Sequence, residues 1–192
     1  KAVSGLLPRT GTVTFDGHDI SRASPGGTVR LGLVHVVEGH RVFTQQTCYD
    51  NLLLAGYGMP RGELSARVEE ALAFFPEIAA KRADKAITLS GGQQKLLEVA
   101  RGLLLDPKLV LIDEPSIGLS PLMVEEVFAI LKGLRDSGVT ILLIEQNARQ
   151  ALAISDYGLV LEQGQTRIED TAASILADPR IAQLFLGGGL KP

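Results

Sequence analysis

The 192-residue sequence contains a single cysteine, no long apolar run and no excess of basic residues. One cysteine, Cys48, excludes an intramolecular disulfide and a metal cluster held by cysteines. No apolar run approaches the roughly 20 residues that a helix needs to cross a bilayer. Acidic residues outnumber basic ones by 22 to 19, which argues against a nucleic-acid partner. These absences leave a soluble globular domain, and we expect it to come from a reducing compartment.

The chain begins at Lys1 without a methionine, and its first eight residues have the pattern of a helix end. Gly5 stands where a glycine commonly closes a helix. We therefore expect the native N-terminus to lie upstream of Lys1.

The fold class follows from three nearly continuous apolar runs that alternate with helical patterns. Runs without polar alternation are typical of strands in a parallel sheet that is covered on both faces. Apolar residues at helical spacing form stripes between these runs. Strand and helix therefore alternate, which predicts an α/β fold. The expected strands are 31–37, 109–112 and 139–144, and the expected helices are 64–75, 96–104 and 124–134.

Four further segments complete the expected architecture. Residues 50–86 have helical patterns and no strand pattern, so we expect a helical insertion there. Residues 11–17 predict a short half-exposed strand, and residues 157–168 predict a hairpin that turns around Gln163-Gly164. A last helix is expected at 172–177.

The first candidate site is the run Leu89-Ser90-Gly91-Gly92-Gln93, which precedes a striped helix. Ser90 can cap that helix, and the two glycines leave backbone N–H groups open at its positive end. This is the arrangement that binds an anion at a helix N-terminus. The alternative is an ordinary serine cap after a glycine-rich loop, and this run alone leaves both interpretations open.

The second candidate site is Asp113-Glu114-Pro115, which follows an apolar strand. In open α/β sheets the carboxyl ends of the strands face the ligand crevice. One carboxylate there can hold Mg²⁺, and a second can orient or deprotonate an attacking water. Acids often merely solvate a strand end, but Asp113 lies 23 residues after Ser90, across a single helix. That placement favours a functional role.

These residues resemble the ATP-binding cassette (ABC) ATPases over essentially the whole chain. Leu-Ser-Gly-Gly-Gln is similar to the family's signature motif, residues 109–114 to its Walker B strand, and residues 116–120 to its D-loop. The resemblance implies a P-loop NTPase-like (RecA-like) domain over residues 1–192, with a mostly parallel sheet, an antiparallel β portion and a helical subdomain. We expect that subdomain at 50–104, between the α/β core segments 1–49 and 105–192.

The resemblance also implies roles for individual residues. Asp113 would serve Mg²⁺, and Glu114 would polarise the hydrolytic water. Two such domains would sandwich two ATP molecules head to tail. Ser90, Gly91 and Gly92 would then contact the γ-phosphate of the ATP held by the opposite subunit. Gln93 would belong to the same nucleotide-binding set.

Two departures from the common family pattern narrow the resemblance to one branch of the family. Glu38 begins a Glu-Gly-x-Arg-x-Phe run where most ABC proteins have the Q-loop glutamine. Gln146, within Glu145-Gln146-Asn147, stands where most have the switch histidine. Both features resemble the ATPase subunits of branched-chain amino acid importers, in particular the LivF type. Because an amide cannot shuttle a proton as imidazole does, we expect Gln146 to hydrogen-bond phosphate or water.

This branch implies a motor for solute uptake at the cytoplasmic face of the plasma membrane, with ATP and Mg²⁺ as cofactors. Its implied partners are transmembrane permease subunits, a second ABC ATPase (LivG-like, or an identical copy) and, indirectly, an extracytoplasmic solute-binding protein. Energy would pass to the permease through the Glu38 loop and the helical insertion.

The sequence contains no Gly-x-x-x-x-Gly-Lys-Ser/Thr loop, which the family pattern places just before Lys1. We therefore expect Mg-ATP hydrolysis from the intact protein and negligible hydrolysis from these 192 residues alone. Three alternatives remain: an importer of urea or short amides, a soluble ABC protein of another class, and a non-catalytic cassette. The presence of both Asp113 and Glu114 argues against the last.

Overall fold

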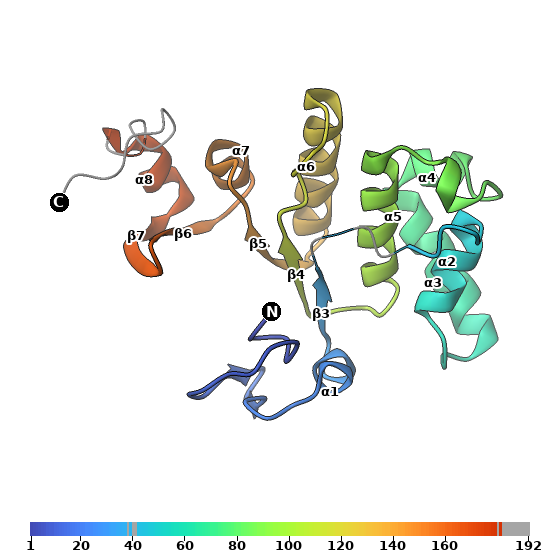
Figure 1. Ribbon diagram of the computed structural model, residues 1–192, viewed down its shortest axis with the longest axis horizontal. Helices are drawn as coiled ribbons and strands as arrows, with labels where there is room; N and C mark the ends of the chain where they lie inside the picture. The colour runs from blue at the N-terminus through green and yellow to red at the C-terminus, as the bar shows by residue number, and fades with distance from the viewer. Residues whose placement is uncertain (38, 40–41, 180, 182–192) are drawn as a thin grey trace. The chain divides into compact units, whose positions relative to one another are not determined.

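The structure, a computed structural model, describes residues 1–37, 39, 42–179 and 181 (Figure 1). The chain divides into two compact units, Lys1–Ile144 and Glu145–Pro192, and each is described separately below. Within the described residues, no helix has both the length and the apolar composition that spanning a bilayer requires.

The first unit is built on three parallel strands in the spatial order β3-β4-β5. These strands are β3 (Leu33–Val36), β4 (Leu109–Asp113) and β5 (Thr140–Ile144). Leu109 of β4 lies opposite Leu33 of β3 on one side and Thr140 of β5 on the other. All three strands predicted from the apolar runs are present, and their parallel pairing confirms the expected fold class.

The three strands differ in burial, and one sequence prediction is wrong in this respect. In β4, Val110, Leu111 and Ile112 are almost fully buried. In β5, the Leu142 and Ile144 side chains are 48% and 45% exposed. The expectation that the third apolar run is covered on both faces therefore fails. An apolar run indicates hydrophobicity, whereas burial depends on which elements stack on each face of the sheet.

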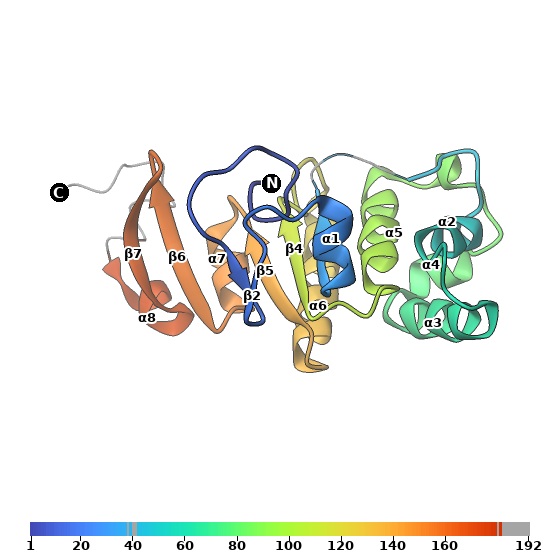
Figure 2. The ribbon, with the colours of Figure 1, turned by 90° about the horizontal axis from the view of Figure 1, so that it is seen from below.

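Among the described residues, four α-helices lie between β3 and β4, and the first three account for the segment 50–86 that was expected to be helical. They are α2 (Cys48–Ala55), α3 (Arg61–Phe74), α4 (Pro76–Ala80) and α5 (Gly91–Leu103), with a 3₁₀ turn at Ala86–Thr88 before α5. Both ribbon views show α2, α3 and α4 gathered on one side of α5 (Figures 1 and 2). A separate subdomain with the bounds 50–104 stays a prediction.

Local sequence signals explain where these helices begin and end. Thr47 caps α2 in a reciprocal capping box with Asp50. Pro76 prevents α3 from continuing, because proline lacks the N–H that the helix would need, and it starts α4 instead. Cys48 is fully buried at the start of α2, as a small apolar residue would be.

The rest of the first unit comprises a β-hairpin and two helices. The hairpin pairs β1 (Thr14–Phe15) with β2 (His18–Asp19) through a turn in which both central residues have positive φ. α1 (Pro25–Arg30) follows it, and neither β2 nor α1 was predicted. α6 (Pro121–Asp136) begins with Ser120 as its cap, as predicted.

The second unit contains a β-hairpin between two short helices. α7 (Ala148–Ala153) leads into β6 (Tyr157–Glu162) and β7 (Gln165–Thr171), and α8 (Ala172–Ala177) follows. The hairpin turns at Gln163 and Gly164, whose φ angles are 50° and 76°. This confirms the predicted turn, since positive φ at both central residues matches the right-handed twist of paired strands.

Candidate phosphate-binding loop and acidic strand end

The signature loop, residues 89–93, forms a reciprocal capping box at the start of α5. The Ser90 Oγ accepts a hydrogen bond from the Gln93 backbone N–H at 3.2 Å. In return, the Gln93 Oε1 accepts one from the Ser90 N–H at 3.1 Å. The spacing Ser-x-x-Gln supplies both partners, so this local geometry follows directly from the sequence.

The first turn of α5 is suited to binding an anion. Backbone N–H groups in the first turn of a helix have no intrahelical acceptor, and the helix dipole places partial positive charge there. Ser90 and Gly91 are exposed residues, so the start of the helix faces solvent. The capping box fixes the direction of the N–H groups, which gives a phosphate group a prepared position.

The two glycines of the loop serve different purposes. The sequence predicts that both are needed to let an anion approach the backbone. Gly92, however, is buried, and a Cβ at this position would lie 2.6 Å from the Met123 Cε and 3.0 Å from its Cγ. Gly92 therefore also makes room for the first turn of α6, which begins beside the first turn of α5 (Figure 1).

The acidic strand end, Asp113 and Glu114, lies where β4 leaves the sheet. Asp113 is the last residue of β4 and is half-buried. Glu114 has a φ of 46°, in the left-handed region, and its N–H donates to the Ile144 carbonyl at 2.9 Å. A non-glycine residue in this region costs about 1–2 kcal/mol. Such strain concentrates at functional sites, where the surrounding structure enforces it.

Asp113 meets the requirements of a magnesium ligand. Its carboxylate makes no hydrogen bond or ion pair with another residue in the part of the chain that the structure describes. Magnesium in nucleotide sites is usually held by one or two carboxylates together with phosphate oxygens and water. The half-buried Asp113 carboxylate at the strand end therefore fits the expected ion.

His35, on β3, is a titratable neighbour of the acidic strand end. Its pairing with Leu111 places it on the same face of the sheet as Asp113. The His35 Nδ1 lies 2.7 Å from the Ser4 Oγ, in a hydrogen bond. Burial lowers the pKa of His35, and the charge of Asp113 opposes this shift only in part. His35 is therefore neutral at neutral pH and adds no positive charge beside Asp113.

The structure does not test the two remaining predicted residues. Glu38 lies outside the described residues. Gln146 is exposed in the second unit, where its N–H and that of Asn147 both donate to the Glu145 carboxylate. The roles of Glu38 and Gln146 stay predictions.

In the structure, two residues that the sequence analysis did not identify contact the signature loop. The Lys81 Nζ donates to the Gln93 Oε1 at 3.1 Å, and the Gln93 Nε2 donates to the Glu77 Oε2 at 3.2 Å. Glu77 and Lys81 are four residues apart, a spacing that places two side chains on one helix face. That spacing was a usable signal, but it could not identify Gln93 as the shared partner.

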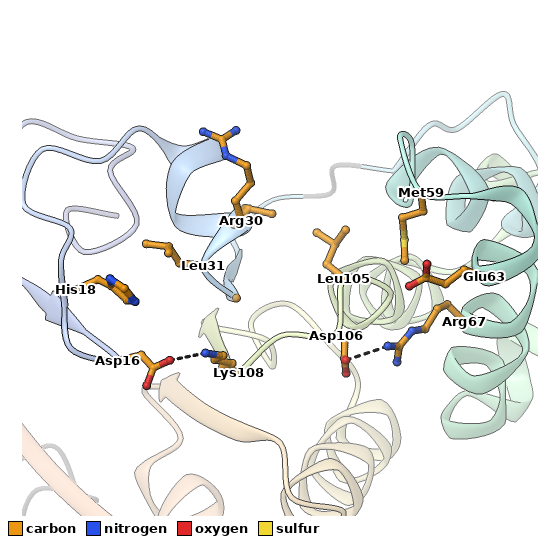
Figure 3. A pocket seen from close by; sticks show the side chains of 12 residues that line it. Asp16, His18, Arg30, Leu31, Met59, Glu63, Arg67, Leu105, Asp106 and Lys108 are labelled. Carbon is orange, nitrogen blue, oxygen red and sulfur yellow. Dashed lines mark hydrogen bonds and ion pairs between the residues drawn. The ribbon is translucent and has the colours of Figure 1, made fainter.

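A hollow of about 410 Å³ lies elsewhere in the first unit and contains none of the predicted site residues (Figure 3). Ion pairs occupy much of its charged lining. Lys108 pairs with Asp16, and Arg67 pairs with Asp106 at 2.9 Å (Figure 3). The candidate site is therefore the signature loop and the acidic strand end rather than this hollow.

Comparison with known proteins identifies the family. The family model for ABC transporters matches residues 1–117, which is more than half of the chain. The chain belongs to the ABC transporter family. It is an ABC ATPase, an ATP-binding subunit of the kind that dimerises and works with membrane permease subunits. The resemblance found in the sequence is thereby confirmed.

Curated relatives of this ABC ATPase serve different transport systems. It is 36% identical over 179 residues to the high-affinity branched-chain amino acid transport ATP-binding protein BraG of Pseudomonas aeruginosa, covering 93% of this chain and 77% of BraG. It is 34% identical to the probable branched-chain amino acid transport ATP-binding protein LivF of Archaeoglobus fulgidus, with 97% and 80% covered. It is also 32% identical to the lipopolysaccharide export system ATP-binding protein LptB of Escherichia coli, with 96% and 78% covered.

A solved structure supports the same fold. The ADP conformation of an ATP-binding cassette of an ABC transporter superposes with a TM-score of 0.80 at 26% identity, over 97% of this chain and 81% of that chain. This likeness confirms the P-loop NTPase-like fold class.

Proposed function

We propose that this ABC ATPase powers the uptake of branched-chain amino acids through a membrane permease. The observation that carries the chemistry is the acidic strand end, where a strained Glu114 follows a carboxylate suited to magnesium. The choice of solute is supported by the BraG and LivF relatives, which are named for branched-chain amino acid transport.

In this proposal each residue of the site has one task. Glu114 accepts a proton from the attacking water or orients that water toward the γ-phosphate. Asp113 holds Mg²⁺, which would supply charge neutralisation at the phosphates. Ser90, Gly91 and Gly92 donate hydrogen bonds to the γ-phosphate of an ATP that the opposite subunit holds. Gln146 hydrogen-bonds the phosphate or the water.

The proposed assembly is a pair of ABC ATPases at the cytoplasmic face of the plasma membrane. The second subunit is LivG-like, or a second copy of this chain. The Glu38 loop and the helical segment that includes α2–α4 transmit the motion of the pair to the permease. An extracytoplasmic binding protein delivers the solute.

The chemical part is tested by phosphate release from Mg-ATP. The natural chain, with any residues that precede Lys1 included, is compared with its Glu114→Gln variant. Loss of the general base is expected to lower turnover by about 10²–10⁴-fold. Glu125→Gln, an exposed carboxylate on α6, is the matched control and should hydrolyse ATP at the wild-type rate. Equal turnover in all three proteins would contradict the role of Glu114.

The solute is tested by uptake of radiolabelled leucine in cells that lack the gene. Uptake should return with the wild-type gene and stay absent with the Glu114→Gln variant. A second candidate function, energising lipopolysaccharide export, is favoured by the LptB relative. Normal leucine uptake in the deletion strain, together with a defect in lipopolysaccharide export, would replace the first proposal with the second.

A further inference from the structure

Both the oxygen and the nitrogen of the Gln93 side-chain amide form hydrogen bonds within the chain. Its Oε1 accepts from the Ser90 N–H and from the Lys81 Nζ, each at 3.1 Å. Its Nε2 donates to the Glu77 Oε2 at 3.2 Å. The amide is therefore engaged before any nucleotide arrives, although the family resemblance places Gln93 among the nucleotide-binding residues.

Glutamine suits this position because it must face a cation and an anion at once. Its carbonyl oxygen accepts from the Lys81 ammonium, and its NH₂ group donates to the Glu77 carboxylate. A glutamate at position 93 could accept from Lys81 but could not donate to Glu77. We call this arrangement of Glu77, Gln93 and Lys81 the glutamine bridge.

The bridge ties the signature loop to a second helix. Glu77 lies in the first turn of α4, and Lys81 directly follows the last residue of that helix. The Oε1 that accepts from Lys81 also accepts from Ser90, so one atom joins α4 to the capping box. Moving the first turn of α5 relative to α4 would break hydrogen bonds to charged groups, which are stronger than neutral ones.

The bridge also brings positive charge to the loop. Lys81 and the Ser90 N–H share one acceptor atom, so the ammonium lies close to the N-terminal end of α5. Its charge adds to the partial positive charge of the α5 N-terminus. Burial, and then the charge of Glu77, raises the pKa of Glu126 on α6.

We propose that the glutamine bridge positions the signature loop for the γ-phosphate, with Gln93 as a positioning residue and Lys81 as the cation that strengthens the loop's attraction for ATP. This inference rests on the proposed contact between the loop and the γ-phosphate. In this inference the Gln93 amide hydrogen-bonds Glu77 and Lys81 rather than the nucleotide.

The first test measures steady-state ATP hydrolysis by the natural chain and three variants. Lys81→Met keeps the capping box and removes the cation, so the KM for ATP should rise about tenfold, as expected for one hydrogen bond to a charged group. Gln93→Glu should lower kcat/KM by a similar factor. Lys85→Met is the matched control, because Lys85 is exposed and its side chain makes no bond among the described residues; its kinetics should match wild type.

A rescue variant separates positioning from general damage to the fold. Combining Gln93→Glu with Glu77→Gln exchanges donor and acceptor, so that an amide at position 77 donates to a carboxylate at position 93. We expect this double variant to recover most of the lost kcat/KM, whereas Glu77→Gln alone should not improve on wild type. Thermal melting should first show that Gln93→Glu and the double variant are both folded. If they are folded and the double variant does not recover kcat/KM, the proposed role of the bridge is refuted.

Hydrogen exchange on the nucleotide-free chain provides a readout that does not depend on activity. The Ser90 amide should exchange faster in Gln93→Ala than in wild type, because its acceptor is lost. Wild-type exchange in Gln93→Ala, or a wild-type KM in Lys81→Met, would refute the inference. If wild type itself does not hydrolyse ATP while exchange responds as expected, the proposed function fails and the bridge stands.

Discussion

The signature loop and the acidic strand end are held in contrasting ways. In the signature loop, side chains from two helices fix the backbone through the capping box and the glutamine bridge. At the acidic strand end, the Glu114 backbone is held in a strained conformation, and Asp113 makes no hydrogen bond or ion pair within the described residues.

This difference matches the two tasks proposed for the site. A loop that recognises phosphate gains affinity when its donors are already oriented, because little entropy is lost on binding. A carboxylate that holds a metal ion has to keep its oxygen atoms available. We therefore expect substitutions in the loop to affect stability as well as ATP kinetics, and substitutions at the strand end to affect turnover with little change in stability.

The largest expected effect is at the strand end. Asp113→Asn should lower Mg-dependent ATP hydrolysis by at least about 100-fold, because a neutral amide is a poor magnesium ligand. The midpoint of thermal unfolding should stay close to wild type, since the Asp113 carboxylate has no partner to lose among the described residues. A large drop in this midpoint would show that Asp113 supports the fold. The contrast between a loop fixed by side-chain bonds and a strand end with an available carboxylate would then be wrong.

The next effect concerns Gly92. Gly92→Ala should destabilise the chain in urea unfolding, because overpacking costs about 1–3 kcal/mol and the better helix propensity of alanine returns less than about 1 kcal/mol. The exposed Gly91→Ala is the control, with a change within about 0.5 kcal/mol. Adding Met123→Ala should weaken the penalty of Gly92→Ala, since the contact of 2.6 Å would disappear. Additive effects would contradict this contact.

A smaller loss of stability is expected from Ser90→Ala. Removing a serine cap costs about 1 kcal/mol. Ser120 caps α6 at 3.4 Å without a reciprocal partner, so Ser120→Ala should cost less than Ser90→Ala in the same urea experiment. The reverse order would show that the capping box adds nothing to the signature loop.

The smallest effect is a pH-dependent one at Glu126. Burial, and then the charge of Glu77, raise the pKa of Glu126 in the folded chain. At acid pH Glu126 is protonated in both the folded and the unfolded chain, so it does not lower the free energy of unfolding. As pH rises, the unfolded chain ionises first, so the wild type loses stability. Glu126→Gln should therefore raise the melting temperature slightly at neutral pH and leave it unchanged at acid pH. The exposed Glu125→Gln should show no such pH dependence.

Several features of the fold could be predicted because their causes are local in the chain. Ser90 and Ser120 mark the first residues of α5 and α6, and Gln163-Gly164 marks the β6–β7 turn. The strands β3 and β4 were predicted from apolar runs, as was the existence of β5. The acidic pair after β4 indicated a site, because strand ends in parallel sheets share one edge.

Other features could not be predicted, because they depend on residues far apart in the chain. The sequence between 139 and 144 is as apolar as a buried strand, yet Leu142 and Ile144 are nearly half exposed. The sequence near Glu114 does not predict a left-handed backbone. In the structure, the Glu114 N–H in this conformation donates a hydrogen bond to the carbonyl of Ile144, 30 residues away.

The sequence by itself determined most of the elements, the caps of α5 and α6, the ABC resemblance and the residue types of the site. Spacing and side-chain chemistry suffice for these, because each depends on a few neighbours along the chain. Only the tertiary structure decided that Gly92 makes room for Met123 and that Gln93 joins Glu77 to Lys81. Such contacts arise when helices pack, and packing brings together side chains that no local pattern relates.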